Sequence, residues 1–292
     1  MTVPDNIHTG FALSLSKKLQ KPLIVNFQDL VPLSQFFPDY CRPYNWTRRF
    51  LMMKYFNLDR VANCSLYTSE GMRDYFGNQS KGKVMYPIGD FNYPKFEINQ
   101  KDSENDVFTL VYAGNCYGSY GRMLLRLAKR IIKTEGIHLK IFPVGRDWAE
   151  EEIELLRKEN IYQSFLPFER LRKELRKADG FLTVMSFEEN DKPFVQTSFT
   201  TKWLDYAPYG KPIFVWAPPY SSAAVFALEH SCGWVCSKND DSFFLQECFK
   251  LIENKSDFDM LSKNTKSVSM TILNPNNIHN TLKSSIEEAI NR

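Results

Sequence analysis

The chain has 292 residues, a length that favours two domains, each large enough for its own hydrophobic core. Its net charge of +3 is small and argues against a broad basic stripe for nucleic acid, although a local basic pocket is compatible with it. No apolar run reaches the roughly 20 residues of a membrane span, and Asp5 and His8 interrupt the N-terminal stretch, which does not resemble a signal peptide.

The first third of the chain alternates short β-rich runs with helical patterns. The runs 22–30, 60–69 and 81–91 each end in turn-forming residues and predict buried strands. Helical patterns lie between them, and the first places Phe11, Leu15 and Leu19 on one face. The predicted helices cover 8–20, 47–59 and 69–77, the last with a Ser at its start and a Gly at its end.

A polar, charged segment at 97–108 is the best domain boundary. Beyond it strands and helices alternate regularly to the end of the chain. The predicted strands are 107–115, 139–145, 161–168, 180–187, 212–217 and 233–237. The predicted helices are 120–136, 148–160, 168–179, 200–209, 222–231, 241–254, 257–272 and 274–292. This alternation predicts an α/β protein whose parallel sheet is covered on both faces and binds its ligand beyond the carboxyl ends of the strands.

The cysteines point to a reduced protein without a metal. The six of them form no CxxC motif, which indicates reduced thiols and a cytoplasmic location. His230, Cys232 and Cys236 resemble a metal cluster, but a strand there puts the two thiols ~13 Å apart, too far for one zinc ion. We therefore expect buried thiols and no metal site.

Gly114, Gly118 and Gly121 follow the strand 107–115 with the spacing GxxxGxxG. This is not the GxGxxG of dinucleotide-binding folds, and no acidic residue follows at the expected distance. A glycine-rich loop before a helix brings backbone N–H groups close to an anion. The alternative is a tight turn that needs glycine for steric reasons.

Lys202 and Asp205 lie near the start of the predicted helix 200–209, after the hydroxyls of Thr200 and Thr201. The free N–H groups of a helix start and the charge of Lys202 suit a phosphate. Asp205 shares a face with Lys202 and, as an acceptor-only group, suits the hydroxyls of a ribose. The alternative is an exposed ion pair between these two residues.

The segment 197–237 resembles the donor-nucleotide segment of GT-B glycosyltransferases, especially the family 4-like group. In that family a Lys near a helix start and an acidic residue precede a Gly-Lys-Pro turn, as Lys202, Asp205 and 210–212 do here. Segments 110–122 and 175–187 resemble the first strand and loop of the same domain and the strand leading to its site. Segments 5–30 and 59–76 resemble parts of the acceptor-side domain.

The resemblance implies two Rossmann-like domains with parallel sheets facing a cleft. It places a partial N-terminal acceptor-side domain at 1–103, a donor-binding domain at 104–275, and a C-terminal helix at 276–292 that packs back on the first domain. Nearly the whole chain is covered. The implied activity is transfer of a hexose from a nucleotide-diphosphate sugar to a glycan or lipid-linked acceptor, as in polysaccharide biosynthesis, with retention of configuration and without metal or cofactor.

The resemblance also implies roles for single residues. Lys202 would bind the diphosphate and stabilise the leaving group. Asp205 would hold the ribose, Phe168 would lie near the base, and Gly114 and Asn115 would approach the phosphates or donor sugar. Thr201 would offer a hydroxyl, and Arg146 would contact a phosphate unless it is simply a solvated Arg. His8 would face the donor sugar, with a helix cap as the alternative. Asp29 would lie on the acceptor side, with a turn-forming role as the alternative.

Two departures from the family are visible. The family has two Glu residues separated by seven others, where this chain has Thr197 and Asp205. Glu188 and Glu189 lie nearby in a predicted loop and are candidates to replace the first carboxylate. The N-terminal domain also lacks its usual glycine-rich opening strand, so we expect it to be incomplete and to need a partner chain or a missing part.

The segment 47–60 is basic and apolar, which suggests peripheral contact with the inner face of the membrane. Burial of its apolar residues against the small domain is the alternative. Two other functions stay open for the chain. One is a non-catalytic nucleotide-binding or scaffold protein, or a fragment, which the short first domain favours. The other is a sugar-nucleotide epimerase, which the missing Glu at position 197 disfavours.

Overall fold

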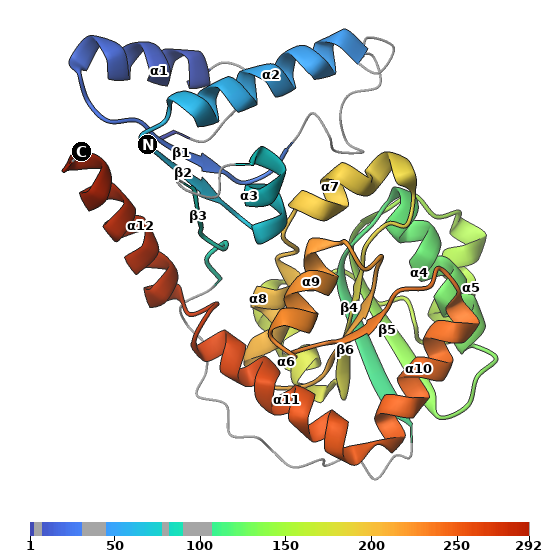
Figure 1. Cartoon of the computed structure of the whole chain (residues 1–292). Coiled ribbons are helices and arrows are strands. Elements are labelled where there is room, and N and C mark those ends of the chain that lie inside the picture. The colour runs from blue at the N-terminus through green and yellow to red at the C-terminus, as the bar shows by residue number, and fades with distance from the viewer. Residues whose placement is uncertain (3–7, 31–44, 78–81, 90–106, 292) are drawn as a thin grey trace. The chain divides into compact units, whose positions relative to one another are not determined.

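The computed structural model of the chain describes residues 1–2, 8–30, 45–77, 82–89 and 107–291. The chain folds into two compact units (Figure 1). Unit 1 comprises Met1–Gly89, Glu189–Thr200 and Ile272–Arg292, and unit 2 comprises Asp90–Glu188 and Thr201–Thr271. Each unit has its own parallel sheet, so the predicted α/β class is confirmed. The polar boundary segment 97–108 lies almost wholly outside the described residues.

Unit 1 is built on the sheet β1-β2-β3. The strands β1 (Ile24–Phe27), β2 (Cys64–Tyr67) and β3 (Gly82–Val84) run parallel, with Ile24 opposite Cys64 and Ser65 opposite Gly82. Thr2 adds a single parallel bridge to Val25 at the β1 edge. The three predicted strands of this region are therefore confirmed, although they are shorter than the apolar runs that indicated them.

Helices cover both faces of this sheet. The helices α1 (His8–Leu19), α2 (Asn45–Val61) and α3 (Glu70–Phe76) contribute to the core that surrounds Val25 and Phe27. On the opposite face, Ala289 of α12 (Pro275–Ile290) packs with Ile24, Cys64 and Leu66. Residues that alternate along β1 and β2 therefore serve two separate hydrophobic clusters.

Helix α3 begins and ends as the sequence predicts. The side chain of Ser69 accepts a hydrogen bond from the Met72 N–H, and Gly77 closes the helix at φ 67°. The short helix α7 (Lys192–Thr197) packs on α3, where Ser69 Oγ also donates to the Thr197 carbonyl at 2.6 Å. One serine thus caps a helix and attaches a segment that is distant in sequence.

Unit 2 contains a five-stranded parallel sheet in the order β5-β4-β6-β7-β8. The strands are β4 (Phe108–Cys116), β5 (Ile137–Arg146), β6 (Gly180–Val184), β7 (Ile213–Trp216) and β8 (Trp234–Cys236). The helices between and after them are α4 (Gly118–Ile131), α5 (Glu150–Lys158), α6 (Phe168–Lys177), α8 (Lys202–Tyr206), α9 (Ser222–Glu229), α10 (Asp241–Glu253) and α11 (Lys255–Met270).

Both faces of the larger sheet are buried. Leu182 and Phe214 pack in a cluster with residues of α4, α5 and α10. Phe181 points to the other face, where its ring stacks on Tyr206 at a centroid distance of 4.6 Å. Continuous burial along β6 and β7 explains why these strands, apart from Thr183, contain no polar side chain and do not alternate.

One predicted strand, 161–168, is wrong. Only a single bridge forms there, between Ile141 and Tyr162. The pairing ends after Gln163, whose N–H donates to the Ile141 carbonyl at 2.9 Å. Pro167 then precedes the first turn of α6, and proline supplies no N–H to a strand ladder.

Candidate nucleotide pocket

A cavity of about 450 Å³ lies in unit 2 at the carboxyl ends of β4 and β5 and the first residues of α6 and α8. Its walls combine a cation, a carboxylate and several apolar side chains. It is lined by Ala113, Gly114, Asn115, Phe142, Pro143, Val144, Phe165, Leu166, Phe168, Leu171, Thr201, Lys202 and Asp205. Six of the residues singled out in the sequence therefore meet here: Gly114, Asn115, Phe168, Thr201, Lys202 and Asp205.

Tyr206 attaches α8 to β4. Its hydroxyl accepts a hydrogen bond from the Ala113 N–H at 2.8 Å and donates to the Ala113 carbonyl at 3.3 Å. The ring is fully buried against Phe181. Because Lys202 lies one helical turn before Tyr206, this anchor directs the lysine side chain toward the end of β4.

Lys202 lies against the backbone of Gly114 and the ring of Tyr112. A β-carbon on residue 114 would come within 2.8 Å of Lys202 Nζ, and Nζ is 4.8 Å from the centroid of the Tyr112 ring. Gly114 has φ 144°, which side chains rarely adopt, so both conformation and space require glycine. Among the described residues no carboxylate lies within ion-pair distance of Nζ, so the exposed pair with Asp205 is not formed.

The helix that carries Lys202 is shorter than the sequence predicts. α8 has 5 residues, and the 3-10 turn Ala207–Tyr209 continues it to Gly210, which ends it at φ 59°. Thr201 occupies the cap position without a side-chain cap hydrogen bond. So short a helix has a weak dipole, and the positive potential of the pocket rests mainly on the ammonium of Lys202.

The two charged groups of the pocket are both perturbed. Burial lowers the pKa of Lys202, while Asp205 and Cys116 partly offset this effect. Asp205 keeps an exposed edge, yet the protein atoms around its carboxyl raise its pKa to about 6, against the lowering effects of Lys202 and Arg172. The pocket therefore combines an ammonium that has no bonded anion among the described residues with a carboxyl whose pKa is raised toward neutral pH.

The opposite wall of the pocket is apolar and partly open to solvent. Phe165 and Phe168 expose large parts of their rings, and the Arg172 guanidinium lies 4.7 Å from the Phe168 ring centroid. Phe165 and the residues Phe142–Val144 were not singled out from the sequence. Phe142–Val144 lie near the carboxyl end of β5, where an α/β sheet binds its ligands, and this position was their only signal. Phe165 lies in the loop before α6.

The glycine-rich loop serves mainly to turn the chain. The Gly118 N–H donates to the Asp147 carboxylate at 2.8 Å, so a protein group already occupies this donor at the start of α4. A β-carbon on Gly121 would lie 2.1 Å from the Cys116 carbonyl oxygen. The steric reading therefore explains Gly118 and Gly121, while Gly114 alone faces the pocket.

Arg146 is not among the residues that line the pocket. Its guanidinium donates to the Tyr162 hydroxyl at 2.9 Å and pairs with Glu150 at 3.2 Å. His8 and Asp29 belong to unit 1. Asp29 accepts a hydrogen bond from Ser198 Oγ at 3.1 Å, and His8 begins α1, although its side chain lies outside the described residues.

The position where the family has its first Glu is structural in this chain. Thr197 is buried, and its hydroxyl donates to the Pro193 carbonyl at 2.8 Å. The nearby carboxylates do not line the pocket either: Glu188 pairs with Arg122, and Glu189 with Lys192 at 3.7 Å. Within the described ranges, the pocket thus contains one carboxylate, that of Asp205.

Cys232 and Cys236 are buried thiols, as expected, and burial raises the pKa of Cys232 to about 12. Cys41 lies outside the described residues. No group of three or more potential metal ligands occurs in the part of the chain that the structure describes. A search of the same residues finds no helix with the length and hydropathy of a membrane span.

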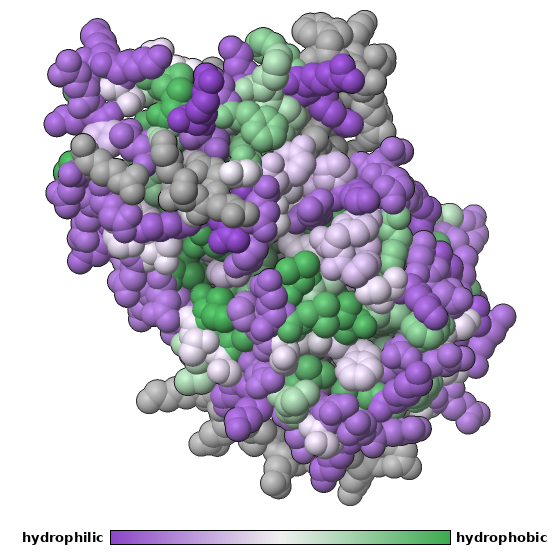
Figure 2. Space-filling view, viewed as in Figure 1, coloured by the Kyte–Doolittle hydropathy of each residue, from purple (hydrophilic) through white to green (hydrophobic). Residues whose placement is uncertain are grey.

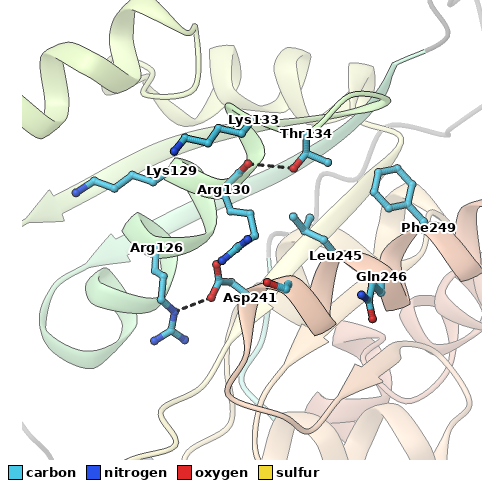
Figure 3. A pocket seen from close by; sticks show the side chains of 10 residues that line it. Arg126, Lys129, Arg130, Lys133, Thr134, Asp241, Leu245, Gln246 and Phe249 are labelled. Carbon is cyan, nitrogen blue, oxygen red and sulfur yellow. Dashed lines mark hydrogen bonds and ion pairs between the residues drawn. The ribbon is translucent and has the colours of Figure 1, made fainter.

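A second cavity, of about 500 Å³, lies between α4 and α10 and is strongly basic (Figure 3). Asp241 pairs with Arg130 and, at 3.2 Å, with Arg126, while Lys129 pairs with Glu152 at 2.7 Å. These three cations connect α4 to α10 and α5. The fourth cation that lines the cavity, Lys133, has no ion pair among the described residues. We interpret this cavity as an interhelical ion-pair network.

No protein-family model matches the chain, and no curated protein is significantly similar to it in sequence. Solved structures are similar in fold. The chain matches HepE of Anabaena in complex with UDP at a TM-score of 0.66 and 14% identity, over 96% of this chain and 75% of that chain. It matches a glycosyltransferase from Rickettsia africae at a TM-score of 0.61 and 13% identity, over 100% of this chain and 85% of that chain. It matches sucrose-phosphate synthase from Thermosynechococcus elongatus at a TM-score of 0.62 and 12% identity, over 94% of this chain and 70% of that chain.

These similarities establish the fold. The two parallel sheets and their covering helices match structures of the GT-B glycosyltransferase fold, as the sequence predicts. Identities of this size carry no residue roles from one protein to another, so the chemistry has to be argued from the pocket itself.

Proposed function

We propose that the chain is a nucleotide-sugar-dependent glycosyltransferase whose donor binds in the unit 2 pocket. One observation carries the proposal: the Lys202 ammonium lies in the pocket wall beside Gly114, and no carboxylate of the described residues pairs with it. A partly buried cation without an anion is costly unless a ligand supplies one. A diphosphate supplies that anion, and the cavity of about 450 Å³ is large enough for a nucleotide.

The remaining walls fit the other parts of such a donor. The carboxylate of Asp205 would accept hydrogen bonds from the ribose hydroxyls. Phe165 and Phe168 present exposed aromatic surface on which a base would stack. Gly114 and Asn115, at the end of β4, would lie beside the phosphates or the sugar. The complexes of HepE with UDP and with UDP-glucose make a uridine donor the first to test.

In the proposed reaction, the bond between the anomeric carbon and the β-phosphate oxygen breaks. The anomeric carbon forms a bond to an acceptor hydroxyl oxygen, whose proton passes to an oxygen of the leaving diphosphate. Lys202 would stabilise the negative charge that develops on the leaving diphosphate, which requires no metal ion in this role. Retention of configuration, a contribution from His8 and Asp29 of unit 1, and a glycan or lipid-linked acceptor are parts of the proposal taken from the family resemblance.

A second function, nucleotide binding without turnover, is favoured by one specific observation. The Thr197 hydroxyl is bonded to the Pro193 carbonyl, and the pocket's one described carboxylate is that of Asp205. A donor sugar would then lack the partner that the family's first Glu provides. The same observation disfavours an epimerase, which needs acid and base groups at the sugar.

The test measures melting temperature with UDP, GDP, ADP and CDP for the wild type, Lys202→Ala and Lys177→Ala. Lys177 is a matched control, because it is exposed in the same unit and forms an i,i+3 ion pair with Glu174. Lys202 forms no such pair with Asp205, although the spacing is the same. A nucleotide at about 100 times its Kd stabilises the fold by ~2.7 kcal/mol. We expect one nucleotide to shift the wild type and Lys177→Ala equally, and to shift Lys202→Ala by about half as much or less.

Turnover is then measured as release of that nucleoside diphosphate from its sugar conjugates, with and without acceptor glycans. Release supports the transferase. Binding with no release under any condition supports the second function. A folded protein that no nucleotide stabilises would contradict both.

A further inference from the structure

Helix α1 presents an apolar stripe to solvent. Ala12 and Leu13 pack against the core of unit 1. Phe11, Leu15 and Leu19, which share one face four residues apart, are 69%, 41% and 55% exposed. The stripe that the sequence singled out is therefore not the face that α1 buries.

Helix α2 repeats this arrangement. Its buried residues Met52, Tyr55 and Leu58 belong to the same cluster that Ala12 and Leu13 contact. On the far side of the helix, Phe50 is 46% and Met53 61% exposed. Burial of apolar residues, the alternative expectation for 47–60, is thus confirmed for one side of the helix, while Phe50 and Met53 stay exposed on the other.

The exposed charged side chains of the two helices are all positive. The sequence of α1 contains no acidic residue, and that of α2 contains only Asp59. Asp59 is buried and accepts a hydrogen bond from the Tyr67 hydroxyl. The cations beside the exposed apolar residues are themselves exposed: Lys17, Lys18, Lys21, Arg49 and Lys54. In the space-filling view, hydrophobic residues reach the surface over α1 and α2 among strongly hydrophilic ones (Figure 2).

We propose that these residues form a surface that binds anionic lipid bilayers. We call it the α1–α2 face, and it consists of Phe11, Leu15, Leu19, Phe50 and Met53 with Lys17, Lys18, Lys21, Arg49 and Lys54. Interfacial helices combine Phe, Leu and Met on one side with Lys and Arg that reach the headgroups. A surface with cations and no exposed carboxylate on its helices complements an anionic leaflet.

The lipid surface is preferred over a protein partner on two grounds. The exposed apolar side chains come from two separate helices and are mixed with lysines, whereas the core of a protein interface is depleted of Lys. Phe11 and Met53 also protrude most, as insertion into the boundary between headgroups and acyl chains requires. This proposal does not depend on the glycosyltransferase activity, since it concerns unit 1 and needs no nucleotide.

The experiment is co-sedimentation of the full chain with vesicles, without nucleotide. One set contains phosphatidylcholine alone, and the other contains about one third phosphatidylglycerol, whose surface potential attracts basic segments. We expect the wild type to sediment with the anionic vesicles only and to dissociate as salt is raised, because screening weakens the attraction.

Two variants address the two parts of the α1–α2 face. Phe11→Ser/Leu15→Ser/Met53→Ser removes apolar surface, and Lys17→Glu/Lys18→Glu/Lys54→Glu reverses charge. Each should lower the bound fraction by about tenfold, with an unchanged melting temperature because all six side chains are exposed. The matched control is Leu228→Ser/Met260→Ser/Met270→Ser, which removes three exposed apolar side chains from unit 2 and should bind as the wild type does.

Two results would overturn the proposal. One is a wild type that stays in the supernatant with both kinds of vesicle. The other is a wild-type dimer in solution that the serine variant converts to a monomer, since a second copy of the chain would then cover the α1–α2 face.

Discussion

The Lys202 ammonium and the Gly114 backbone lie so close that a β-carbon on residue 114 would stand 2.8 Å from Nζ. Tyr206, one turn further along α8, fixes this relationship through its two hydrogen bonds to Ala113. The positive charge is thus directed at the end of β4 rather than at Asp205. A charge placed in this way is available to a ligand, and this is the basis of the proposed donor site.

Removal of that charge should weaken nucleotide binding without unfolding the protein. A hydrogen bond to a charged group contributes ~1.5–3 kcal/mol, so Lys202→Ala should raise the Kd of the nucleoside diphosphate about ten- to a hundredfold. Isothermal titration calorimetry measures the change. Lys177→Ala, which loses the same charge outside the pocket, should keep the wild-type Kd.

Gly114→Ala should displace the Lys202 side chain and so weaken nucleotide binding, although Lys202 itself is unchanged. Its β-carbon needs the space that Nζ and Cε occupy, and φ 144° strains any side chain. We expect a lower melting temperature and a Kd raised by about tenfold or more, as for loss of the charged contact. Gly77→Ala is the control, because Gly77 also has a positive φ, 67°, but its β-carbon would meet nothing within 4 Å. If both variants lose stability and neither loses affinity, the Lys202–Gly114 contact has no role in binding.

Asp205 should make both stability and donor binding depend on pH, in opposite directions. Its folded pKa of about 6 lies above the unfolded value, so the folded protein holds this proton more tightly. The free energy of unfolding should therefore fall as pH rises from about 4 to about 6, and this part of the slope should vanish in Asp205→Asn. Solvent at its exposed edge reduces the size of the effect.

Donor affinity should rise over the same pH range, because only the ionised carboxylate accepts two ribose hydroxyls. The ligand for this titration is a nucleotide-diphosphate sugar, since a terminal phosphate has its own pKa near 6 and would mask the change. An affinity whose pH profile is the same in the wild type and in Asp205→Asn would show that Asp205 does not contact the ribose.

Phe168→Ala should weaken binding of the base. Stacking of a base on an aromatic ring contributes ~1–3 kcal/mol, which corresponds to a Kd raised about five- to a hundredfold. Phe243→Ala is the control, since that ring also lies under a cation, Lys238 at 3.8 Å, but outside the pocket. Comparison of nucleoside diphosphate with inorganic diphosphate separates the effects, because the latter has no base and should bind the Phe168→Ala variant as it binds the wild type.

The alternation of strands and helices was enough to predict the α/β class and the position of almost every element of unit 2. It failed at 161–168, where an apolar run before Pro167 looks like a strand in sequence but finds only one bridge to β5. Local pattern cannot reveal whether a neighbouring strand offers free backbone groups. The same limit applies to α1, where the pattern places Phe11, Leu15 and Leu19 on one face, but tertiary packing uses Ala12 and Leu13 instead.

The pocket was predictable in part. Lys202, Asp205 and Gly114 could be singled out because charge, spacing and glycine are visible in sequence. Phe165 and Phe142–Val144 could not, since nothing in the sequence distinguishes an apolar residue of a pocket wall from one of the core. That Lys202 and Asp205 form no ion pair also required the structure, because it depends on how Tyr206 anchors α8 to β4.

A structure of the protein with UDP, or with whichever nucleoside diphosphate shifts its melting temperature, would show whether the unit 2 pocket is the donor site. We predict β-phosphate oxygens within hydrogen-bond distance of Lys202 Nζ, the ribose at Asp205 and the base against Phe165 and Phe168. A nucleotide bound elsewhere, for example in the basic cavity between α4 and α10, would contradict this prediction.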